Sequence, residues 1–435
     1  MYEYPKLDQA HERINAIVDY AHLQQEVGAP GVAEVLERVD RCLADALAAL
    51  QSLAPDPQLA AREPDDYEAI LALRPEGPRR LWKALSPAYA SRLSGAFHAR
   101  AAGCTLGAIV ENWSVAAMRE FAAQTGDAFP PTQYWKEAAT PWQVRYEKSA
   151  CRDYTRTHMD GLPVDDDMTY TALGLLIAEQ CGLDFTTADV GRIWLKYLPV
   201  ACTAEAAALD NLRRGVPAGE AALSNNPYVQ WIGADIRSDP FAYMAPGWPE
   251  RAARMAYQDA YLSHRRNGIY GEMFFAAAQS AAFAVNDALE ALRIGLTEIP
   301  ADCLLAHDLR WALEVAPNLR DYRDGREAVD QRFGAMHPVH TNNNACLTVF
   351  GLALGKGDVT ETLSQTVAMG LDNDCTAATA GSIAGAIAGI EGVDARWIVP
   401  FHNRMLTYMR EDAGSFAIDE LLARFHRQAE LAFAE

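Results

Sequence analysis

The segment VDDDMTYTALGLLIAEQCG, residues 164–182, joins three consecutive aspartates to a long run of mostly apolar residues. Within it, TALGLLIAEQ (171–180) carries apolar side chains at steps of three and four residues, the spacing that places them on one helix face. Acidic residues directly before such a run are typical of a helix N-terminus, where the first backbone N–H groups are unpaired. The segment therefore predicts an α-helix with dense negative charge at its start.

Helical periodicity extends over much of the remaining chain. Its clearest segments cover residues 33–53, 252–264 and 274–296, where apolar residues recur at the same spacing. Alternating, β-branched patterns typical of strands are almost absent. We therefore predict an all-α fold, a multi-helix globule with its functional residues on the loops between helices.

Two proline-rich breaks lie near the N-terminus, APDPQ at 54–58 and RPEGP at 74–78. Because proline does not fit a helix interior, these breaks separate an N-terminal helical pair from the rest of the chain. We predict a helical appendage over residues 1–90 and one all-α domain, containing the functional site, over residues 91–435.

The chain is acidic, with 58 Asp and Glu against 38 Lys and Arg and a formal net charge of −20. This balance argues against a nucleic-acid partner and fits a metal ion or a small cationic partner. The 8 cysteines are scattered without CxxC spacing, and no apolar run is long enough to cross a membrane. We expect a cytoplasmic protein with reduced thiols, since the first residues carry no export signal. The oligomeric state stays open.

A second acidic motif lies in GLDNDCTAATAGSIAGAIAG, residues 370–389, where Asp372 and Asp374 precede another helix of small residues. One interpretation is that the carboxylates of both motifs cap their helices. Capping needs one carboxylate per helix, however, and the two helices present five. The surplus favours a hard cation such as Mg²⁺ or Ca²⁺, provided that the two helix starts face the same cleft.

The helix of the second motif carries glycines at four-residue intervals, Gly381, Gly385 and Gly389. This spacing leaves one face without side chains, onto which another helix can pack very closely. We interpret the glycines as a means of close helix packing. This packing would hold the loop that contains Asp372 and Asp374 rigidly in place.

These motifs resemble those of the ADP-ribosylglycohydrolase family, the relatives of dinitrogenase reductase-activating glycohydrolase. DDDMTYTALGL resembles the family's Thr-Asp-Asp-Thr segment, and the 370–389 segment resembles its Gly-x-Asp-x-Asp-Thr segment. AAGCTLGAIVENWS (101–114) is similar to a first-helix Gly-Cys-x-x-Gly motif that leads into an acidic residue. The motifs occur in the family's order over about residues 95–410, and their DDD and DxDC spellings resemble those of a bacterial branch.

The resemblance implies an all-α globule with two Mg²⁺ ions in a central cleft, used to hydrolyse the bond from C1 of a ribose to a leaving group. Ca²⁺ and Mn²⁺ are alternative metals. Asp166 and Asp167 match the paired aspartates of the family's first metal motif, and Asp372 and Asp374 match those of its second.

Two positions depart from the family pattern. Asp165 stands where the family has Thr, and the added carboxylate makes the site more negative. Cys375 stands where the family has Thr or Ser, and a thiol is a poor ligand for a hard cation. Both departures bear on the number and identity of the ions. The candidate metal ligands are Asp165, Asp166, Asp167, Asp372, Asp374 and Cys375.

Glu111 is the candidate for the acidic residue of the first-helix motif, and Trp113 beside it is a candidate for stacking on a base. A plain helix-terminal glutamate is the alternative. We take Asp166, Asp374 and Glu111 as the candidate catalytic bases, one of which would accept a proton from the attacking water.

Two further segments supply candidate substrate-binding residues, SHRRNGIYGEMF (263–274) and MHPVHTNNNACLTVF (336–350). Both lie next to helix ends, so helix capping is an equal alternative. The HPVH spacing hints at zinc, but no matching His or Cys pair lies nearby, which argues against a zinc site. The substrate-binding candidates are His264, Asn267, Tyr270, His340 and Asn343, together with Trp113.

The resulting hypothesis is a Mg²⁺-dependent glycohydrolase acting on a small-molecule or protein-linked ADP-ribosyl or related ribosyl substrate. One alternative is hydrolysis of another N- or O-glycoside, such as a nucleoside-like metabolite, and another is non-catalytic binding of ADP-ribose. An isoprenoid-synthase-like bundle is disfavoured, because Thr169 and Tyr170 stand where its Asp-Asp-x-x-Asp motif needs the last carboxylate.

Overall fold

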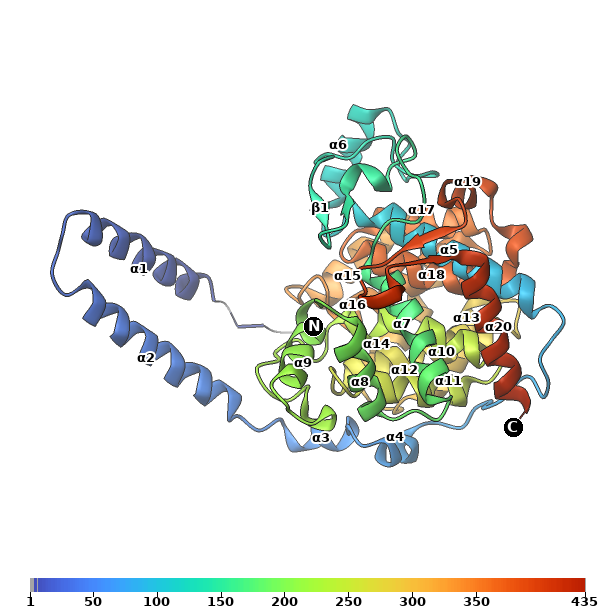
Figure 1. Ribbon diagram of the computed structural model, residues 1–435, viewed down its shortest axis with the longest axis horizontal. Helices are drawn as coiled ribbons and strands as arrows, with labels where there is room; N and C mark the ends of the chain where they lie inside the picture. The colour runs from blue at the N-terminus through green and yellow to red at the C-terminus, as the bar shows by residue number, and fades with distance from the viewer. Residues whose placement is uncertain (1–3, 6, 435) are drawn as a thin grey trace. The chain divides into compact units, whose positions relative to one another are not determined.

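The structure, a computed structural model, describes residues 4, 5 and 7–434 (Figure 1). The regular secondary structure of the described chain is almost entirely helical, which confirms the predicted all-α class. Its α-helices are α1 Asp8–Glu26, α2 Val32–Gln51, α3 Pro57–Arg62, α4 Tyr67–Leu73, α5 Tyr89–Ala108, α6 Val115–Thr125, α7 Asp166–Cys181, α8 Thr187–Tyr197, α9 Thr203–Arg213, α10 Asp239–Met244, α11 Pro249–Ala260, α12 Asn267–Ala282, α13 Ala288–Gly295, α14 Leu304–Val315, α15 Tyr322–Phe333, α16 Thr341–Gly355, α17 Val359–Met369, α18 Asn373–Ala388, α19 Ala395–Ile398 and α20 Ile418–Ala434.

Short 3₁₀ helices and two small antiparallel hairpins complete the described structure. The strands are β1 Val144–Arg145, paired with β2 Ser149–Ala150, and β3 Arg404–Leu406, paired with β4 Ser415–Ala417. The 3₁₀ helices are η1 Cys151–Tyr154, η2 Ala218–Glu220, η3 Ile232–Arg237, η4 Leu296–Glu298, η5 Ala316–Asn318, η6 Ile390–Gly392, η7 Val399–Phe401 and η8 Glu411–Ala413. No helix in the described part of the chain is both long and apolar enough to cross a membrane.

The chain divides into two compact units, the first ending at Ala61 and the second beginning at Arg62. The first unit contains the helical pair α1 and α2 (Figure 1), and no residue of either helix is buried. Residues 62–88 belong to the second unit, where Arg74 pairs at 2.6 Å with the buried Glu298. The division predicted after residue 90 stays a prediction, for which two truncations described below provide a test.

The core of the second unit surrounds α12. Every residue of α12 is buried, because its sequence NGIYGEMFFAAAQSAA is apolar on all sides and such a helix is stable only when other elements enclose it. The neighbouring helices α11, α13 and α18 pack against it. The helix α16, which is also almost wholly buried, packs against α17 and α18.

The helices α5 and α18 lie in close backbone contact, as the glycine spacing of α18 predicts. A Cβ added at Gly385 would lie 2.2 Å from the carbonyl oxygen of Gly95, and one at Gly381 would lie 2.4 Å from another carbonyl oxygen of α5. On the α5 side, a Cβ at Gly107 would lie 2.4 Å from the Cα atom of Asp374. The end of α5 therefore holds the acidic start of α18 in place.

Candidate functional site

The two acidic motifs converge on one cavity. Asp165 is the N-cap residue of α7, with Asp166 and Asp167 in the first turn, while Asp372 and Asp374 occupy the same places at α18. Asp166, Asp372 and Asp374 line a cavity of about 360 Å³. The structure thus brings together helix starts that lie far apart in the sequence, as a shared metal site requires.

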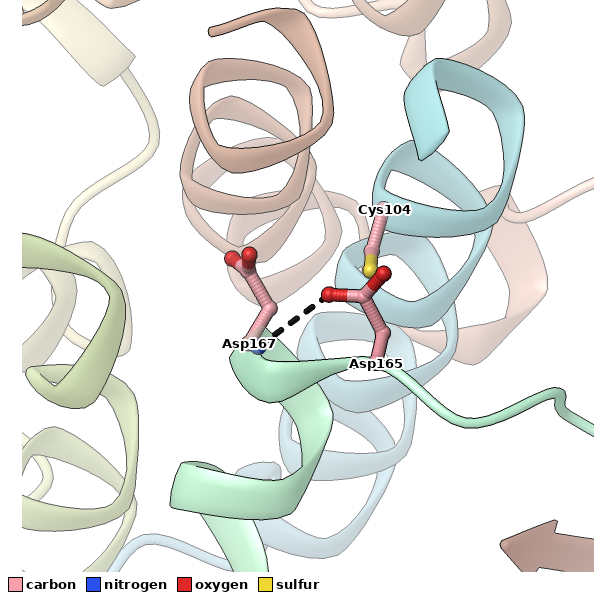
Figure 2. A group of neighbouring side chains, drawn as sticks. All are labelled: Cys104, Asp165 and Asp167. Carbon is pink, nitrogen blue, oxygen red and sulfur yellow. Dashed lines mark hydrogen bonds between the residues drawn. The ribbon is translucent and has the colours of Figure 1, made fainter. Parts of the chain in front are cut away.

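Three groups of side chains have possible ligand atoms within 4.8 Å of one another. The groups are Cys104 with Asp165 and Asp167, Asp167 with Asp374 and Cys375, and Glu111 with Asp372 and Asp374. Figure 2 shows the first group, in which the Cys104 thiol of α5 lies beside the Asp165 carboxylate and the Asp167 N–H donates to Asp165 Oδ1 at 3.2 Å. Cys104 is the cysteine of the first-helix motif and was not among the ligands predicted from the sequence.

The oxygen atoms of the second motif fit a cation. Asp372 and Asp374 are only 4% and 2% exposed, and Oδ1 of each has no hydrogen-bond partner among the described residues. A buried carboxylate oxygen without a donor is costly, so the arrangement favours a bound cation. The Cys375 thiol donates to Asp167 Oδ2 at 3.3 Å, and it therefore acts here as a hydrogen-bond donor.

Burial and mutual repulsion raise the pKa values of these carboxyl groups. The pKa of Asp165 rises to about 8, chiefly through burial and then through the charge of Asp166. Burial and Glu111 raise the pKa of Asp372 to about 7, and the same two causes raise the pKa of Asp374 well above its usual range. A cation among them would stabilise the ionised forms and lower these pKa values.

The hairpin of β1 and β2 places two side chains against the motifs. Arg145 Nη2 lies 3.2 Å from Asp165 Oδ2 and 3.5 Å from Asp374 Oδ2, and Arg145 Nη1 donates to Glu111 at 3.1 Å. The Tyr146 hydroxyl donates to Asp166 Oδ1 at 2.7 Å. Neither residue was predicted from the sequence, because the segment around them carries no recognisable motif.

Aromatic and acidic residues complete the cavity wall. Trp231, Tyr170 and Glu205 line it, and the half-buried Trp231 ring stacks on His337 at a centroid distance of 3.9 Å. Burial raises the pKa of Glu205 to about 7, although its ion pair with Arg237 opposes the shift. The only sequence signal for Trp231 is its position in a long loop that is rich in aromatic residues.

Three of the predicted substrate-binding residues make internal contacts and do not line the cavity. His264 is wholly buried, with Nδ1 2.8 Å from Ser263 Oγ. The Asn267 side chain donates to Glu63 Oε2 at 3.1 Å, and the Tyr270 hydroxyl donates to a backbone carbonyl of the segment before α4. These contacts tie the start of α12 to neighbouring segments.

The remaining predicted residues lie at the edge of the site or away from it. Glu111 lines the cavity, whereas Trp113 packs edge-on against a phenylalanine and does not line it. His340 Nδ1 accepts the backbone N–H of Asn342 at 3.1 Å and so caps α16. Asn343 donates its side-chain amide to a backbone carbonyl in the loop before α16. A direct role of these residues in binding substrate stays a prediction.

Comparison with known proteins identifies the family of this chain. The sequence model of the ADP-ribosylglycohydrolase family matches residues 85–430, so the chain belongs to the ADP-ribosylglycohydrolase family. Among solved structures, an ADP-ribosylglycohydrolase-related protein complex is similar at 18% identity, with a TM-score of 0.47 over 78% of this chain and 99% of that chain. No curated protein gives a match. Family membership confirms the family predicted from the sequence and supports glycohydrolase activity on ADP-ribosyl-like substrates.

Proposed function

We propose that this protein is a metal-dependent glycohydrolase that cleaves the C1 glycosidic bond of an ADP-ribosyl or related ribosyl substrate. The observation that supports this most strongly is the meeting of two aspartate motifs at one cavity, in a chain that belongs to this family. A cavity of about 360 Å³ accommodates a small-molecule fragment such as a ribose with part of its leaving group.

The metal would be Mg²⁺, two ions by analogy with the family, with Ca²⁺ or Mn²⁺ as alternatives. Its ligands would come from the two motifs, where unpaired buried carboxylate oxygens are available. Bound Mg²⁺ would orient the ribose hydroxyls and lower the pKa of a water molecule. The proposed ligands are Asp165, Asp166, Asp167, Asp372, Asp374 and Cys375.

The side chains of the cavity would carry out the remaining chemistry. Glycoside hydrolysis passes through an oxocarbenium-like state, which the negative charge of the motifs would stabilise. Asp166, Asp374 and Glu111 all line the cavity, and one of them would take the proton of the attacking water. Trp231 would offer an aromatic face to the leaving group.

A second candidate is hydrolysis of a smaller N- or O-glycoside, such as a nucleoside-like metabolite. The volume of about 360 Å³ favours it, because ligand pockets range from about 300 to 1,000 Å³ and this one is near the lower end. A substrate with a compact leaving group would be enclosed more completely than a whole ADP-ribosyl group.

The test is the release of free ADP-ribose, or of a simpler pentose, from a panel of ribosylated substrates with Mg²⁺ and with a chelator. We expect turnover that requires the metal, and Asp372→Ala should reduce it by at least about 100-fold, because loss of a ligand removes more than the 10- to 100-fold effect of an outer-shell partner. Asp302→Ala is the matched control, since this aspartate is 74% exposed.

Each result leads to a different conclusion. Release of pentose from simple glycosides alone would favour the second candidate over ADP-ribosyl hydrolysis. Binding of ADP-ribose without turnover of any substrate, in the presence of Mg²⁺, would overturn the enzymatic proposal and leave a binding protein. Equal turnover with Mg²⁺ and with chelator would contradict the proposed metal dependence.

A further inference from the structure

The guanidinium group of Arg145 lies where the two acidic motifs meet. Its Nη2 atom lies 3.2 Å from Asp165 Oδ2 of the first motif and 3.5 Å from Asp374 Oδ2 of the second. Its Nη1 atom donates to Glu111 Oε2 at 3.1 Å and to the Ala108 carbonyl, at the end of α5, at 2.7 Å. The positively charged guanidinium group of Arg145 therefore bridges the carboxylates of three separate segments.

The hairpin holds Arg145 in this position. The Ser149 hydroxyl accepts the backbone N–H of Val164, the residue directly before the first motif, at 3.1 Å. Tyr146, next to Arg145, donates to Asp166 and stacks on Tyr408 at a ring-centroid distance of 5.3 Å. Arg145 is only 17% exposed, so its pairs with the carboxylates are weakly screened by solvent.

Two sets of carboxylate oxygens are distinguished by their contact with Arg145. Glu111 Oε2, Asp165 Oδ2 and Asp374 Oδ2 face the guanidinium group. Asp372 Oδ1 and Asp374 Oδ1 are buried and have no hydrogen-bond partner among the residues that the structure describes. The second set is available to a further cation without displacing Arg145.

We infer that Arg145 takes the place of one of the two expected divalent cations, so that the site binds a single divalent ion beside a fixed guanidinium group. Because guanidinium stays charged at any accessible pH and cannot accept a water ligand, this half of the site positions carboxylates and supplies no water to the reaction. The inference rests on the proposed function, in which the carboxylates bind a metal.

The test is to count the Mn²⁺ ions bound per chain at saturation, using the full-length protein and the electron paramagnetic resonance signal of free Mn²⁺. We expect one ion in the wild type and two in Arg145→Gln, because removal of the guanidinium group frees three carboxylate oxygens. Arg145→Lys should stay at one ion, since it keeps the positive charge. Arg152→Gln is the matched control, as this arginine follows the same hairpin but is 40% exposed and stacks on Trp142.

Two ions in the wild type would overturn the inference, and so would equal counts in the wild type and in folded Arg145→Gln. If Arg145→Gln fails to fold, the inference is tested by the number of ions bound to the wild type and to Arg145→Lys. One bound ion in each of these two proteins would support it. The proposed function fails separately, through absence of Mg²⁺-dependent turnover, whatever the ion count. No bound Mn²⁺ in any variant would overturn both the inference and the metal dependence of the proposed function.

Discussion

The three consecutive aspartates at the N-terminus of α7, the N-cap Asp165 and the first two helical residues, have three different environments. Asp165 pairs with Arg145, and Asp166 faces the cavity and accepts the Tyr146 hydroxyl. Asp167 is wholly buried and lies 3.4 Å from Arg100. The repulsion between adjacent carboxylates is thus offset by separate donors, and only the middle aspartate of the three lines the cavity.

Arg100 shows how much the acidic helix start depends on buried countercharge. Its side chain is fully buried and pairs with Asp239 at 2.7 Å as well as with Asp167. We predict that Arg100→Met lowers the free energy of unfolding by about 3–5 kcal/mol, because two buried carboxylates lose their partner. Urea unfolding measures the effect, with Arg192→Met as a control because Arg192 is 58% exposed. A decrease in the free energy of unfolding below about 1 kcal/mol would show that Arg100 is not needed to stabilise the two buried carboxylates.

His264 should make stability depend on pH. Burial and the nearby charge of Arg237 lower its pKa well below the usual 6.5, so the folded protein keeps this imidazole neutral. As the pH falls below about 6.5, the unfolded chain binds a proton that the folded chain does not, and the free energy of unfolding decreases by up to about 1.4 kcal/mol per pH unit. Above that pH the contribution is complete.

When the pH is lowered from about 7.5 to about 5.5, the free energy of unfolding should decrease in both proteins. We expect the decrease to be about 1 kcal/mol smaller in His264→Gln than in the wild type, as urea unfolding would measure. His307→Gln serves as the control, since His307 is about half exposed (48%). The same loss in wild type and His264→Gln would contradict the assignment of a neutral buried imidazole.

At the scale of elements, the site depends on contact between α5 and α18. The end of α5 carries Gly107 against Asp374, and the start of α18 brings the second motif to the cavity. Because the two backbones touch, neither helix can shift without moving carboxylates. The glycines are required here for close approach and not for backbone flexibility.

The contact gives a specific prediction for Gly385→Ala. The new Cβ would lie 2.2 Å from the carbonyl oxygen of Gly95, so the helices must separate, and we expect a loss of at least about 2 kcal/mol in the free energy of unfolding. Gly219→Ala is the control, since a Cβ there meets nothing within 4 Å. If both variants unfold at the same urea concentration, the α5–α18 contact is looser than described.

At the scale of the whole molecule, the second unit contains its own core and both acidic motifs. The helices α1 and α2 of the first unit contain no buried residue. Residues 62–88 differ, because Arg74 and Arg79 both pair with the buried Glu298. The structural role of the N-terminal 90 residues is therefore not uniform along their length.

Two truncations test where the domain begins. A variant that begins at Arg62 should keep its melting temperature within about 2 °C of the full chain, because the removed residues contribute little buried surface. A variant that begins at residue 91 should melt about 4–7 °C lower, since Glu298 loses both arginines and an unpaired buried charge costs about 3–5 kcal/mol. Calorimetry distinguishes them, and equal melting temperatures would support the division after residue 90.

The sequence by itself determined the helical class, the family and the two aspartate motifs, because helical periodicity and runs of like charge are local patterns. Tertiary structure alone decided which side chains meet these motifs. Arg145 and Trp231 reach the cavity from segments that supplied no predicted site residue, whereas His264 and Asn267, which were candidates for either substrate binding or helix capping, make internal contacts. The physical reason is that burial, and the choice of partner for each buried charge, depend on chain segments far apart in the sequence.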